Sequence, residues 1–542
     1  MTKKQGLLNR RQLFDAALTG AAGITLMSCG GAKSGGTKGA SSAAGVNASA
    51  TQTKEQPRKG GTLRIAQVGD ISFQSVPWLN DPAPLLLWTV FEPVVRYRHD
   101  LTPELVLVDK FEYNADKTKL TMSLLSGLQF HDGSPVTAGD VLFAVDVIKN
   151  PTKYGASTTQ LAGFVPFLAD VTKIDDRTVE FTFTQPRANM NDFFAQLTIT
   201  KATTYGDLLK GKNVQGTGVY KLDSWQPGKG YSLSANKNWH GTAKEGGPYL
   251  DGIDVKLFAD LSAVDLAIQS GDIDLTIGGI APSNAVKYRD KHQTYVPPTT
   301  GVTALICNVT NPQLQDKRVR QALLWALDKE RIHKQAYFEF AALQVEPWPK
   351  TSPAYDPALD NPHFDPEKAK SLLKQAGFSQ SEPISLEFIN SGDNTLPQII
   401  QQNLDSVGVK IKLLPEERTD WLGKWIKGQL SGLWIYGLSY AQMTPVSFFE
   451  QSVGMRPTGN PSHFTDSDYS QLVKDLDTAD PFGAHAKDLY KAFNNLWFDQ
   501  AFAVAFAGNQ GLDVASKKVH GFGDYFLSVF FQRNFAPVWI EA

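Results

Sequence analysis

Residues 206–212 have the most specific spacing in the chain for chemistry on a phosphate group. Their sequence, GDLLKGK, places two glycines and a lysine as a phosphate-binding loop does, where backbone N–H groups surround the phosphates. Such a loop continues with a serine or threonine that binds Mg²⁺, but Asn213 stands at this position. No strong strand pattern precedes the segment. The sequence therefore does not predict nucleotide binding here.

Other catalytic and metal-binding motifs are missing from the sequence. It contains no Gly-x-Ser-x-Gly, His-Glu-x-x-His or Cys-x-x-Cys pattern, and its 9 histidines are scattered. The run His131-Asp132-Gly133 is typical of a turn. We therefore expect no catalytic residues, no metal site and no cofactor, and we expect a binding function. A secreted enzyme remains an alternative.

The composition is that of a folded protein with more than one hydrophobic core. The chain has 542 residues, of which 42% are hydrophobic and 20% are charged. A single core stops growing at about 250–300 residues, so we expect at least two cores. The 53 Lys and Arg residues face 55 Asp and Glu residues, which leaves no basic excess for a nucleic-acid partner. Two cysteines exclude a disulfide-based scaffold.

The elements that must position any site follow an α/β pattern. Residues 61–68, 178–184 and 409–413 alternate between polar and apolar side chains, as half-buried strands do. The last of these follows residues 396–407, whose pattern is typical of a helix that ends at Gly408. A strand directly after a helix predicts a βαβ unit.

Two further helices begin at aspartates that can cap them. Asp316 precedes a run whose apolar residues fall on one helical stripe: Val319, Leu323, Ala326, Leu327 and Ile332. Asp365 and Pro366 begin a second helix, and Gly377 ends it. These signals predict one helix through residue 332 and another over about ten residues after Asp365.

The first 28 residues are typical of an export signal. The basic residues that begin it are Lys3, Lys4, Arg10 and Arg11. The apolar run 18–27 that follows is too short to span a bilayer securely. Residues 9–14, NRRQLF, resemble a twin-arginine signal, and residues 26–29, LMSC, resemble a bacterial lipobox. The lipobox resemblance implies cleavage before Cys29 and a diacylglyceryl group on its sulfur.

Residues 29–59 form a segment rich in Gly, Ala, Ser and Thr that cannot bury enough apolar surface to order itself. We expect a flexible tether between the lipid and the folded protein. With Cys29 lipidated, Cys307 has no cysteine with which to pair.

From about residue 60 onward the chain resembles the solute-binding proteins of peptide- and nickel-type ABC importers, family 5. The segments that carry the resemblance keep the family's order along the chain: 91–95, 128–141, 216–222, 268–274, 316–322 and 367–377. Each also has a local physical interpretation, such as close backbone approach at Gly216 and Gly218. Most of the resemblance therefore concerns the fold, and function needs separate evidence.

The resemblance implies an α/β fold of two lobes, periplasmic-binding-protein-like of class II, with mixed sheets and a hinge. Lobe I would comprise residues 60–96, 206–300 and 501–542, with residues 97–205 as an inserted subdomain; lobe II would be residues 301–500. Two chain crossings would form the hinge, where a few residues absorb the rotation. Gly301 and Gly508 are candidate hinge neighbours.

The resemblance also implies a ligand cleft lined by both lobes. The implied ligand-binding residues are Trp421, Trp425, Tyr440, Ala441, Asn460 and Asn308. For the two tryptophans a role in the core is an equal alternative, and Tyr440 and Asn308 could equally be structural. Peptide binders in this family usually carry Asp-Tyr where this chain has Ala441-Gln442, and the aspartate pairs with the peptide's amino terminus.

The missing aspartate bears on the kind of solute. A buried ammonium without a counter-charge costs several kcal/mol, so Ala441 counts against simple recognition of a free amino terminus. Another acid, Glu416, Glu417 or Asp420, could take over this role.

The resemblance implies a monomeric lipoprotein outside the cytoplasm, held through Cys29 to the outer face of the cell membrane or in the periplasm. It would capture an oligopeptide or peptide-like solute and deliver it to ABC permease subunits driven by ATPases. A non-peptide solute such as an oligosaccharide is the main alternative, because aromatic side chains can stack on sugar rings.

Overall fold

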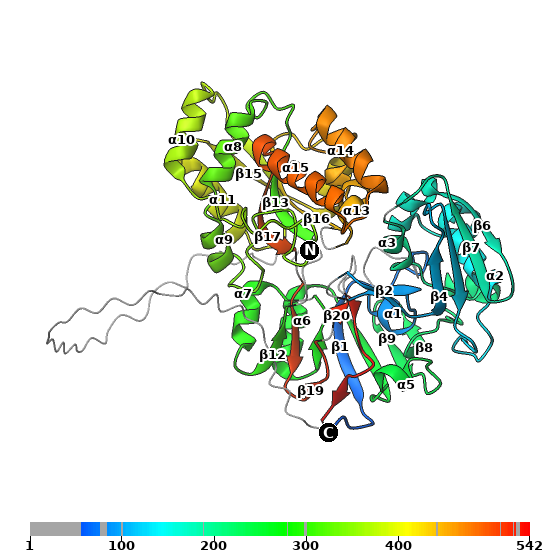
Figure 1. Cartoon of the computed structure of the whole chain (residues 1–542). Helices are drawn as coiled ribbons and strands as arrows, with labels where there is room; N and C mark the ends of the chain where they lie inside the picture. The colour runs from blue at the N-terminus through cyan, green and yellow to red at the C-terminus, as the bar shows by residue number, and fades with distance from the viewer. Residues whose placement is uncertain are drawn as a thin grey trace, which may run out of the picture. The chain divides into compact units, whose positions relative to one another are not determined.

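The computed structural model describes residues 56–75, 84–98, 101–187, 189–278, 280–296, 301–440, 443–509, 511–523, 525–526 and 532–541 (Figure 1). The predicted export signal, Cys29 and most of the predicted tether lie outside these residues, as do Ala441 and Gln442. The described residues all fall within one unit, 46–542.

The largest sheet has seven strands and both parallel and antiparallel pairs. Its order is β12 (His292–Tyr295), β18 (Asp513–Ser516), β11 (Leu275–Thr276), β1 (Thr62–Val68), β10 (Gly252–Phe258), β9 (Gly230–Ala235) and β8 (Tyr220–Gln226). Strand β1 runs parallel to β10 and β11, while β9 runs antiparallel to β10. The alternation in residues 61–68 therefore predicted a central strand of this sheet.

A five-stranded sheet follows the order β15 (Ile411–Glu416), β14 (Ile384–Ile389), β16 (Leu433–Ser439), β13 (Gly301–Cys307) and β17 (Ala503–Asn509). Strands β14 and β15 are parallel and are joined through α11 (Thr395–Ser406), which confirms the predicted βαβ unit. The predicted strand begins two residues later than expected, at Ile411. Gly408 follows the helix with a φ of 93°, a conformation that suits glycine.

A third sheet is antiparallel and contains β4 (Val108–Tyr113), β5 (Lys119–Leu124), β7 (Thr178–Phe183) and β6 (Leu168–Lys173), in that order. The predicted strand 178–184 is β7, and its alternate residues Val179, Phe181 and Phe183 are buried. Helix α2 (Ala138–Lys149) packs against β6 and β7 (Figure 1). Short two-stranded pairs are β2 (Val95–Tyr97) with β3 (Pro103–Leu105), β19 (Val519–His520) with β22 (Trp539–Ile540), and β20 (Tyr525–Phe526) with β21 (Gln532–Arg533).

The predicted helix after Asp316 is divided into two. Asp316 caps α8 (Lys317–Ala326) by accepting from the Arg318 N–H, as expected. Leu327 is extended, and Asp328 caps a second helix, α9 (Lys329–Gln335), through the Arg331 N–H. All five stripe residues are nevertheless buried. The single-helix prediction was wrong because Asp328 offers a second capping side chain, which favours a new helix start over continuation.

The remaining helices cover the sheets or connect them. Helix α10 (Pro366–Gln375) has the predicted Asp365 cap and Gly377 stop, and it packs on α8. The others are α1 (Pro84–Thr89), α3 (Met190–Phe194), α4 (Tyr205–Leu208), α5 (Thr242–Glu245), α6 (Leu261–Ser270), α7 (Pro282–Ala285), α12 (Arg418–Ile426), α13 (Pro445–Gln451), α14 (Ser467–Thr478) and α15 (Ala484–Gln500). Among the described residues, none of the helices has both the length and the apolar character to cross a membrane.

Buried hydrophobic residues form three clusters, as a chain of this length requires. One surrounds β13, β14 and α8, one lies between β1 and α6, and the largest includes residues of all three main sheets. The chain passes from the seven-stranded to the five-stranded sheet between β12 and β13, and returns between β17 and β18. Gly301 and Gly508 lie at these passages, in neighbouring strands. The lobe boundaries and the hinge remain predictions.

Two of the segments that carry the family resemblance meet in the structure. The Gly216 N–H donates to His131 Nδ1, and His131 Nε2 lies 3.0 Å from the Gly218 carbonyl oxygen. A Cβ on Gly216 would lie 1.9 Å from the Val90 oxygen, and one on Gly218 would lie 2.2 Å from the Thr89 oxygen. The prediction of close backbone approach at both glycines is confirmed.

Candidate functional site

Helix α12 and strand β16 bring three aromatic side chains of the predicted site region together. Trp421 and Trp425 are four residues apart, so they lie on one face of α12. Their rings are nearly parallel, with centroids 6.3 Å apart and an interplanar angle of 14°. Tyr436 of β16 contacts both rings, at centroid distances of 4.9 and 4.7 Å. The pairing of the two tryptophans is explained by helical spacing alone.

These aromatic residues combine burial with unused hydrogen-bond donors. Trp421 is fully buried, Trp425 is partly buried, and Trp434 lies two residues before Tyr436 on the same face of β16. Within the described residues, the indole Nε1 atoms of all three tryptophans have no acceptor. A buried donor without a partner costs about 1–3 kcal/mol. A carbonyl or hydroxyl oxygen of a solute would remove this cost. We define Trp421, Trp425, Trp434 and Tyr436 as the aromatic cluster.

Tyr440 lies just beyond β16 in a strained backbone conformation. Its φ is 69°, which is uncommon for a residue with a Cβ and marks positions held by their surroundings. The side chain is buried, and burial, with the nearby Asp192 carboxylate, raises the pKa of its hydroxyl. The predicted neighbour Ala441 lies outside the described residues.

The two predicted asparagines use their amides within the chain. Asn308 donates to the Leu430 oxygen and accepts from the Thr310 N–H and hydroxyl. Asn460 donates to the Arg456 and Phe464 oxygens and accepts from Ser462 Oγ. These bonds hold the loops in which the asparagines lie. A ligand contact by either side chain would compete with them, and their binding role remains a prediction.

The three acids that the sequence suggested as substitutes lie at the end of β15 and the start of α12. Glu416 pairs with Lys424 at 2.6 Å, and this hydrogen bond raises the pKa of Lys424. Glu417 and Asp420 are exposed. Glu416 and Asp420 line an open polar hollow that also contains Thr419 and Lys427. None of the three is a buried carboxylate without a counter-charge.

Sequence reasoning missed a buried polar network near Tyr440. Asp192 of α3 is fully buried and accepts from Tyr97 Oη at 2.7 Å. It also accepts from the hydroxyls of Thr444 and Ser447, both at 2.5 Å, and from the Thr444 N–H. Burial raises the pKa of Asp192 to about 6 although these donors oppose the shift. The network joins α3 to α13.

A second buried interaction joins the same parts of the chain. The Arg187 side chain is fully buried, and its Nη2 lies 2.6 Å from both carboxylate oxygens of Glu450. Its Nη1 lies 3.1 Å from Asp477 Oδ2, and the guanidinium sits 3.6 Å from the centroid of the Phe167 ring. No local pattern could have shown these partners, because 263 residues separate Arg187 from Glu450.

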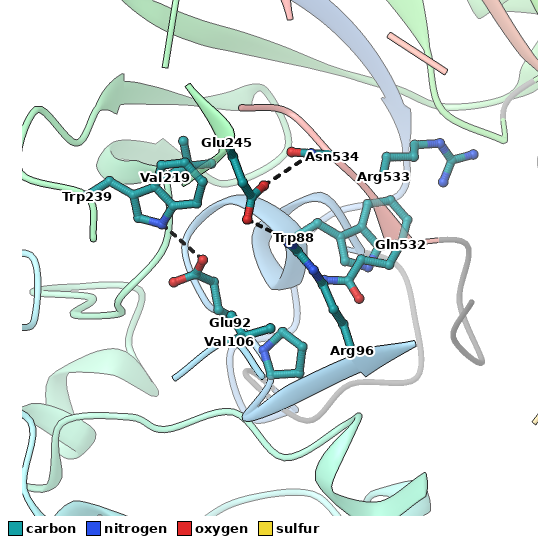
Figure 2. Close-up of a pocket in the computed structure, with 11 residues that line it drawn as sticks. Trp88, Glu92, Arg96, Val106, Val219, Trp239, Glu245, Gln532, Arg533 and Asn534 are labelled. Atoms are coloured by element: carbon teal, nitrogen blue, oxygen red, sulfur yellow. Dashed lines mark hydrogen bonds and ion pairs between the residues drawn. The ribbon is translucent and has the colours of Figure 1, made fainter. Parts of the chain in front are cut away.

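A small cavity beside α1 explains one of the resemblance segments, that at 91–95. Trp88, Glu92, Arg96, Trp239 and Glu245 are among the residues that line it (Figure 2). Glu92 accepts from Trp239 Nε1 at 3.0 Å, and Arg96 pairs with Glu245 at 2.6 Å. The cavity, of about 20 Å³, has room for one water molecule. Glu92 therefore has a structural role.

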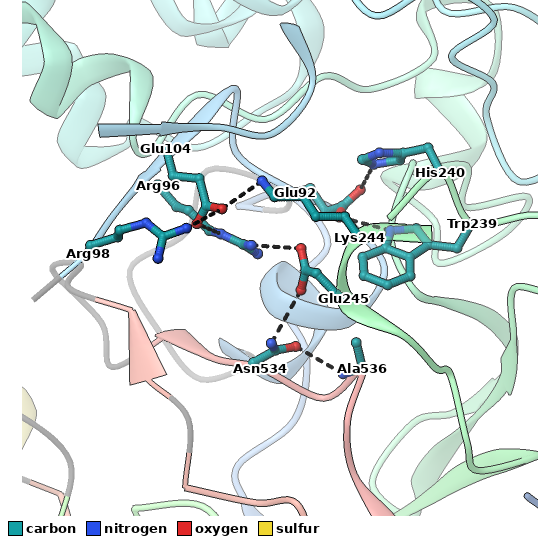
Figure 3. Close-up of polar contacts among 10 residues, drawn as sticks. All are labelled: Glu92, Arg96, Arg98, Glu104, Trp239, His240, Lys244, Glu245, Asn534 and Ala536. Atoms are coloured by element: carbon teal, nitrogen blue, oxygen red, sulfur yellow. Dashed lines mark hydrogen bonds and ion pairs between the residues drawn. The ribbon is translucent and has the colours of Figure 1, made fainter. Parts of the chain in front are cut away.

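Beside this cavity, Glu104 is held by three cations, which Figure 3 shows with the residues around them. Arg96 lies 3.0 Å, Arg98 2.9 Å and Lys244 2.6 Å from its carboxylate oxygens. Burial opposes ionisation, but hydrogen bonds from Lys244 and Arg96 lower the pKa of Glu104 to about 2. Glu104 therefore has its counter-charges within the chain.

Within the described ranges, no group of three or more His, Cys, Asp or Glu residues is arranged to hold a metal ion. The family of bacterial extracellular solute-binding proteins, family 5 (middle part), matches residues 102–460. The chain belongs to this family.

Curated and solved members of the family are similar over most of the chain. The dipeptide-binding protein of Escherichia coli (strain K12) is 26% identical over 469 residues, covering 80% of this chain and 86% of that protein. The Helicobacter pylori periplasmic binding protein DppA, solved with the peptide STSA, has a TM-score of 0.73 at 22% identity, covering 90% of this chain and 99% of DppA.

A further solved structure has another solute. AgaA from A. tumefaciens R10, solved in complex with agropinic acid, has a TM-score of 0.70 at 20% identity and covers 89% of this chain and 99% of AgaA. The predicted fold class, a mixed α/β periplasmic-binding-protein fold, is confirmed by these likenesses. As a family 5 protein, the chain is a solute-binding protein.

Proposed function

We propose that this family 5 protein captures an oligopeptide or peptide-like solute outside the cytoplasm and delivers it to an ABC importer. The observation that carries the proposal is the family match over residues 102–460, together with a relative that is a dipeptide-binding protein and a solved likeness that holds a peptide. Family 5 proteins are solute binders, and we propose binding rather than catalysis.

The aromatic cluster supports a peptide as the solute. Its unpartnered indole N–H groups are donors, and a peptide presents a carbonyl oxygen at every residue. Aromatic faces also pack well on apolar side chains. Trp421, Trp425, Tyr440, Ala441, Asn460 and Asn308 remain the proposed binding residues, and the first two have the clearest chemistry for the role.

We propose that the solute is trapped by closure of two lobes with the predicted boundaries. The chain crosses between the seven-stranded and five-stranded sheets twice, so a rotation needs backbone change at only two places. The closed protein would then be recognised by two permease subunits that are driven by cytosolic ATPases. We propose a monomer, anchored by lipid on Cys29 to the outer face of the cell membrane or in the periplasm.

A non-peptide solute, such as an oligosaccharide, is the second candidate. Sugar hydroxyls also accept from indole N–H groups, and sugar rings stack on aromatic faces. The fold with agropinic acid bound shows that a likeness at this level does not fix one solute. In the structure the face of Trp421 is covered by Trp425 and Tyr436, which favours donation from the indoles over ring stacking.

Calorimetric titration of the full chain with a set of short peptides and oligosaccharides tests the proposal. We expect a peptide to bind and its affinity to fall about 3- to 10-fold in Trp425→Phe, because this change removes the indole donor and keeps an aromatic ring. Phe482→Ala, at a site with 49% exposure, is the matched aromatic control and should bind normally. Binding of an oligosaccharide without any peptide would replace the first candidate by the second.

A further inference from the structure

A cavity of about 110 Å³ lies along residues 342–360, in the segment that connects α9 to α10. This segment is tied to β17, because Leu343 pairs with Ala507 and the Gly508 N–H donates to the Ala342 oxygen. Trp348, which lines the cavity, packs on Phe448 of α13 at a centroid distance of 4.9 Å. The cavity therefore lies beside the strand that leads back to the seven-stranded sheet.

Two of the residues that line the cavity have buried polar side chains, each with one atom that lacks a hydrogen-bond partner among the described residues. Glu346 is 1% exposed; its Oε2 accepts from the Asp356 N–H at 3.0 Å, while its Oε1 has no donor among the described residues. Gln344 is 6% exposed, and its Nε2 has no acceptor within the same ranges. Leaving these two atoms without partners is costly, because polar groups in a protein interior normally form hydrogen bonds. Together they offer one acceptor and one donor.

The charges around the cavity are predominantly negative. Asp360 accepts from Tyr355 Oη at 2.7 Å and pairs with Lys350 at 2.9 Å, but the Lys350 side chain is 72% exposed and lies at the rim. Burial, with repulsion from Asp356 and Asp360, raises the pKa of Glu346 to about 7. No ion pair joins Glu346 to a cation within the described residues.

We propose that this cavity receives a cationic group of the captured solute, a primary ammonium or a guanidinium, with Glu346 as its counter-charge. The inference rests on the proposed function. A cavity of about 150 Å³ holds a benzene ring in another protein, so the present one has room for an ammonium with a few methylenes. Trp348 and Tyr355 add aromatic surface that attracts cations, and the Gln344 amide can donate to a neighbouring carbonyl.

The assignment also selects among the acids that could replace the aspartate missing at residue 441. Glu416 is paired with Lys424, and Glu417 and Asp420 are exposed to solvent. Only a desolvated carboxylate gains strongly from a cation, since exposed ion pairs contribute at most about 1 kcal/mol. Unlike these three acids, Glu346 is buried.

Three peptide probes test the proposal by calorimetry on the full chain: Ser-Thr-Ser-Ala, its N-acetylated form, and N-acetylated Ser-Lys-Ser-Ala. We expect at least one cationic probe to bind about 10-fold or more tightly than the neutral one. The probe that is favoured tells whether the cation is the amino terminus or a side chain. Glu346→Gln should reduce this ratio to about 1 by weakening only the cationic probe, because the glutamine oxygen can still accept from the Asp356 N–H.

Glu417→Gln, at an exposed carboxylate, is the matched control and should keep the ratio. A ratio that survives Glu346→Gln, or that is lost in Glu417→Gln instead, overturns the proposal.

Small amines separate this proposal from the proposed function. At matched ionic strength, propylammonium should raise the melting temperature of the parent chain but not of Glu346→Gln, while propanol should raise neither. If no peptide binds, this pattern still supports the cation site and the peptide function alone fails. An equal response of parent and Glu346→Gln to propylammonium overturns the site.

Discussion

At the scale of single residues, His131 shows how a residue that could do chemistry serves the fold instead. Its ring nitrogens face the backbone of Gly216 and Gly218, so the neutral ring accepts at Nδ1 and donates at Nε2. Burial lowers the pKa of His131 to about 4. A protonated ring would place a second N–H against the Gly216 N–H. The neutral form is therefore part of the folded state.

We predict a pH-dependent contribution of His131 to stability. The unfolded chain takes up a proton near pH 6.5, whereas the folded chain resists it until about pH 4, so stability is complete above pH 6.5 and is lost as pH falls toward 4. The shift corresponds to about 3 kcal/mol. Urea unfolding at pH 7, 5.5 and 4 should show a smaller loss for His131→Gln than for the parent. Equal losses in the two proteins would contradict the assignment.

Local residue patterns could predict helix caps and turns, but they could not predict which partners a side chain finds for its hydrogen bonds in the folded protein. The Asp316 and Asp365 caps and the glycines at 216 and 218 could be predicted because each depends on neighbours in sequence or on the absence of a Cβ. The sequence could not show that the side-chain amides of Asn308 and Asn460 form hydrogen bonds within the chain. Their partners, such as Leu430, are fixed only by folding.

At the scale of elements, the segment just before α3 is joined to α13 and α14 by a buried arginine and two partly buried acids. Arg187 faces Glu450 and Asp477, whose side chains are 13% and 18% exposed. Burial, together with repulsion from Glu450, raises the pKa of Asp477. The arginine is what allows the two acids to lie together. The contact is therefore sensitive to loss of one member.

We predict that Arg187→Met destabilises the protein by about 3–5 kcal/mol, because it leaves two partly buried carboxylates without the buried cation that they share. Lys153→Met is the control, since it breaks an ion pair with Asp146 in which the lysine is 60% exposed and should cost less than about 1 kcal/mol. Denaturant unfolding of both variants measures the difference. Similar small losses would show that the buried pair contributes no more than a surface pair.

Helices and strands could be predicted where the hydrophobic pattern and the capping or stop residues indicated the same boundaries. The βαβ unit of β14, α11 and β15 followed from periodicity and one glycine. The division of α8 from α9 was missed because a continuous apolar stripe hides a capping residue within it. The contact of α3 with α13 could not be predicted from local patterns, because it depends on how distant parts of the chain pack together.

At the scale of the whole molecule, motifs spread over most of the chain indicated membership of family 5. The same motifs did not identify the solute. The family shares one fold, whereas the recognition of the solute that we propose depends on a few side chains, such as Glu346, and on the residue at position 441. Sequence could place Trp421 and Trp425 on one helix face. It could not show that, among the described residues, their indole N–H groups have no acceptor, or that Glu346 lines a cavity.

We propose that one cysteine, Cys29, determines where the whole molecule is held. A single acyl chain binds a membrane only marginally, whereas the two chains of a diacylglyceryl group on Cys29 would hold the protein stably. We predict that the parent protein remains in the membrane fraction after carbonate washing and that Cys29→Ser is released. Cys307→Ser is the matched control, because Cys307 is buried in the fold and should leave anchoring unchanged. Retention of Cys29→Ser with the membranes, at the level of the parent, would mean that another part of the chain provides the anchor.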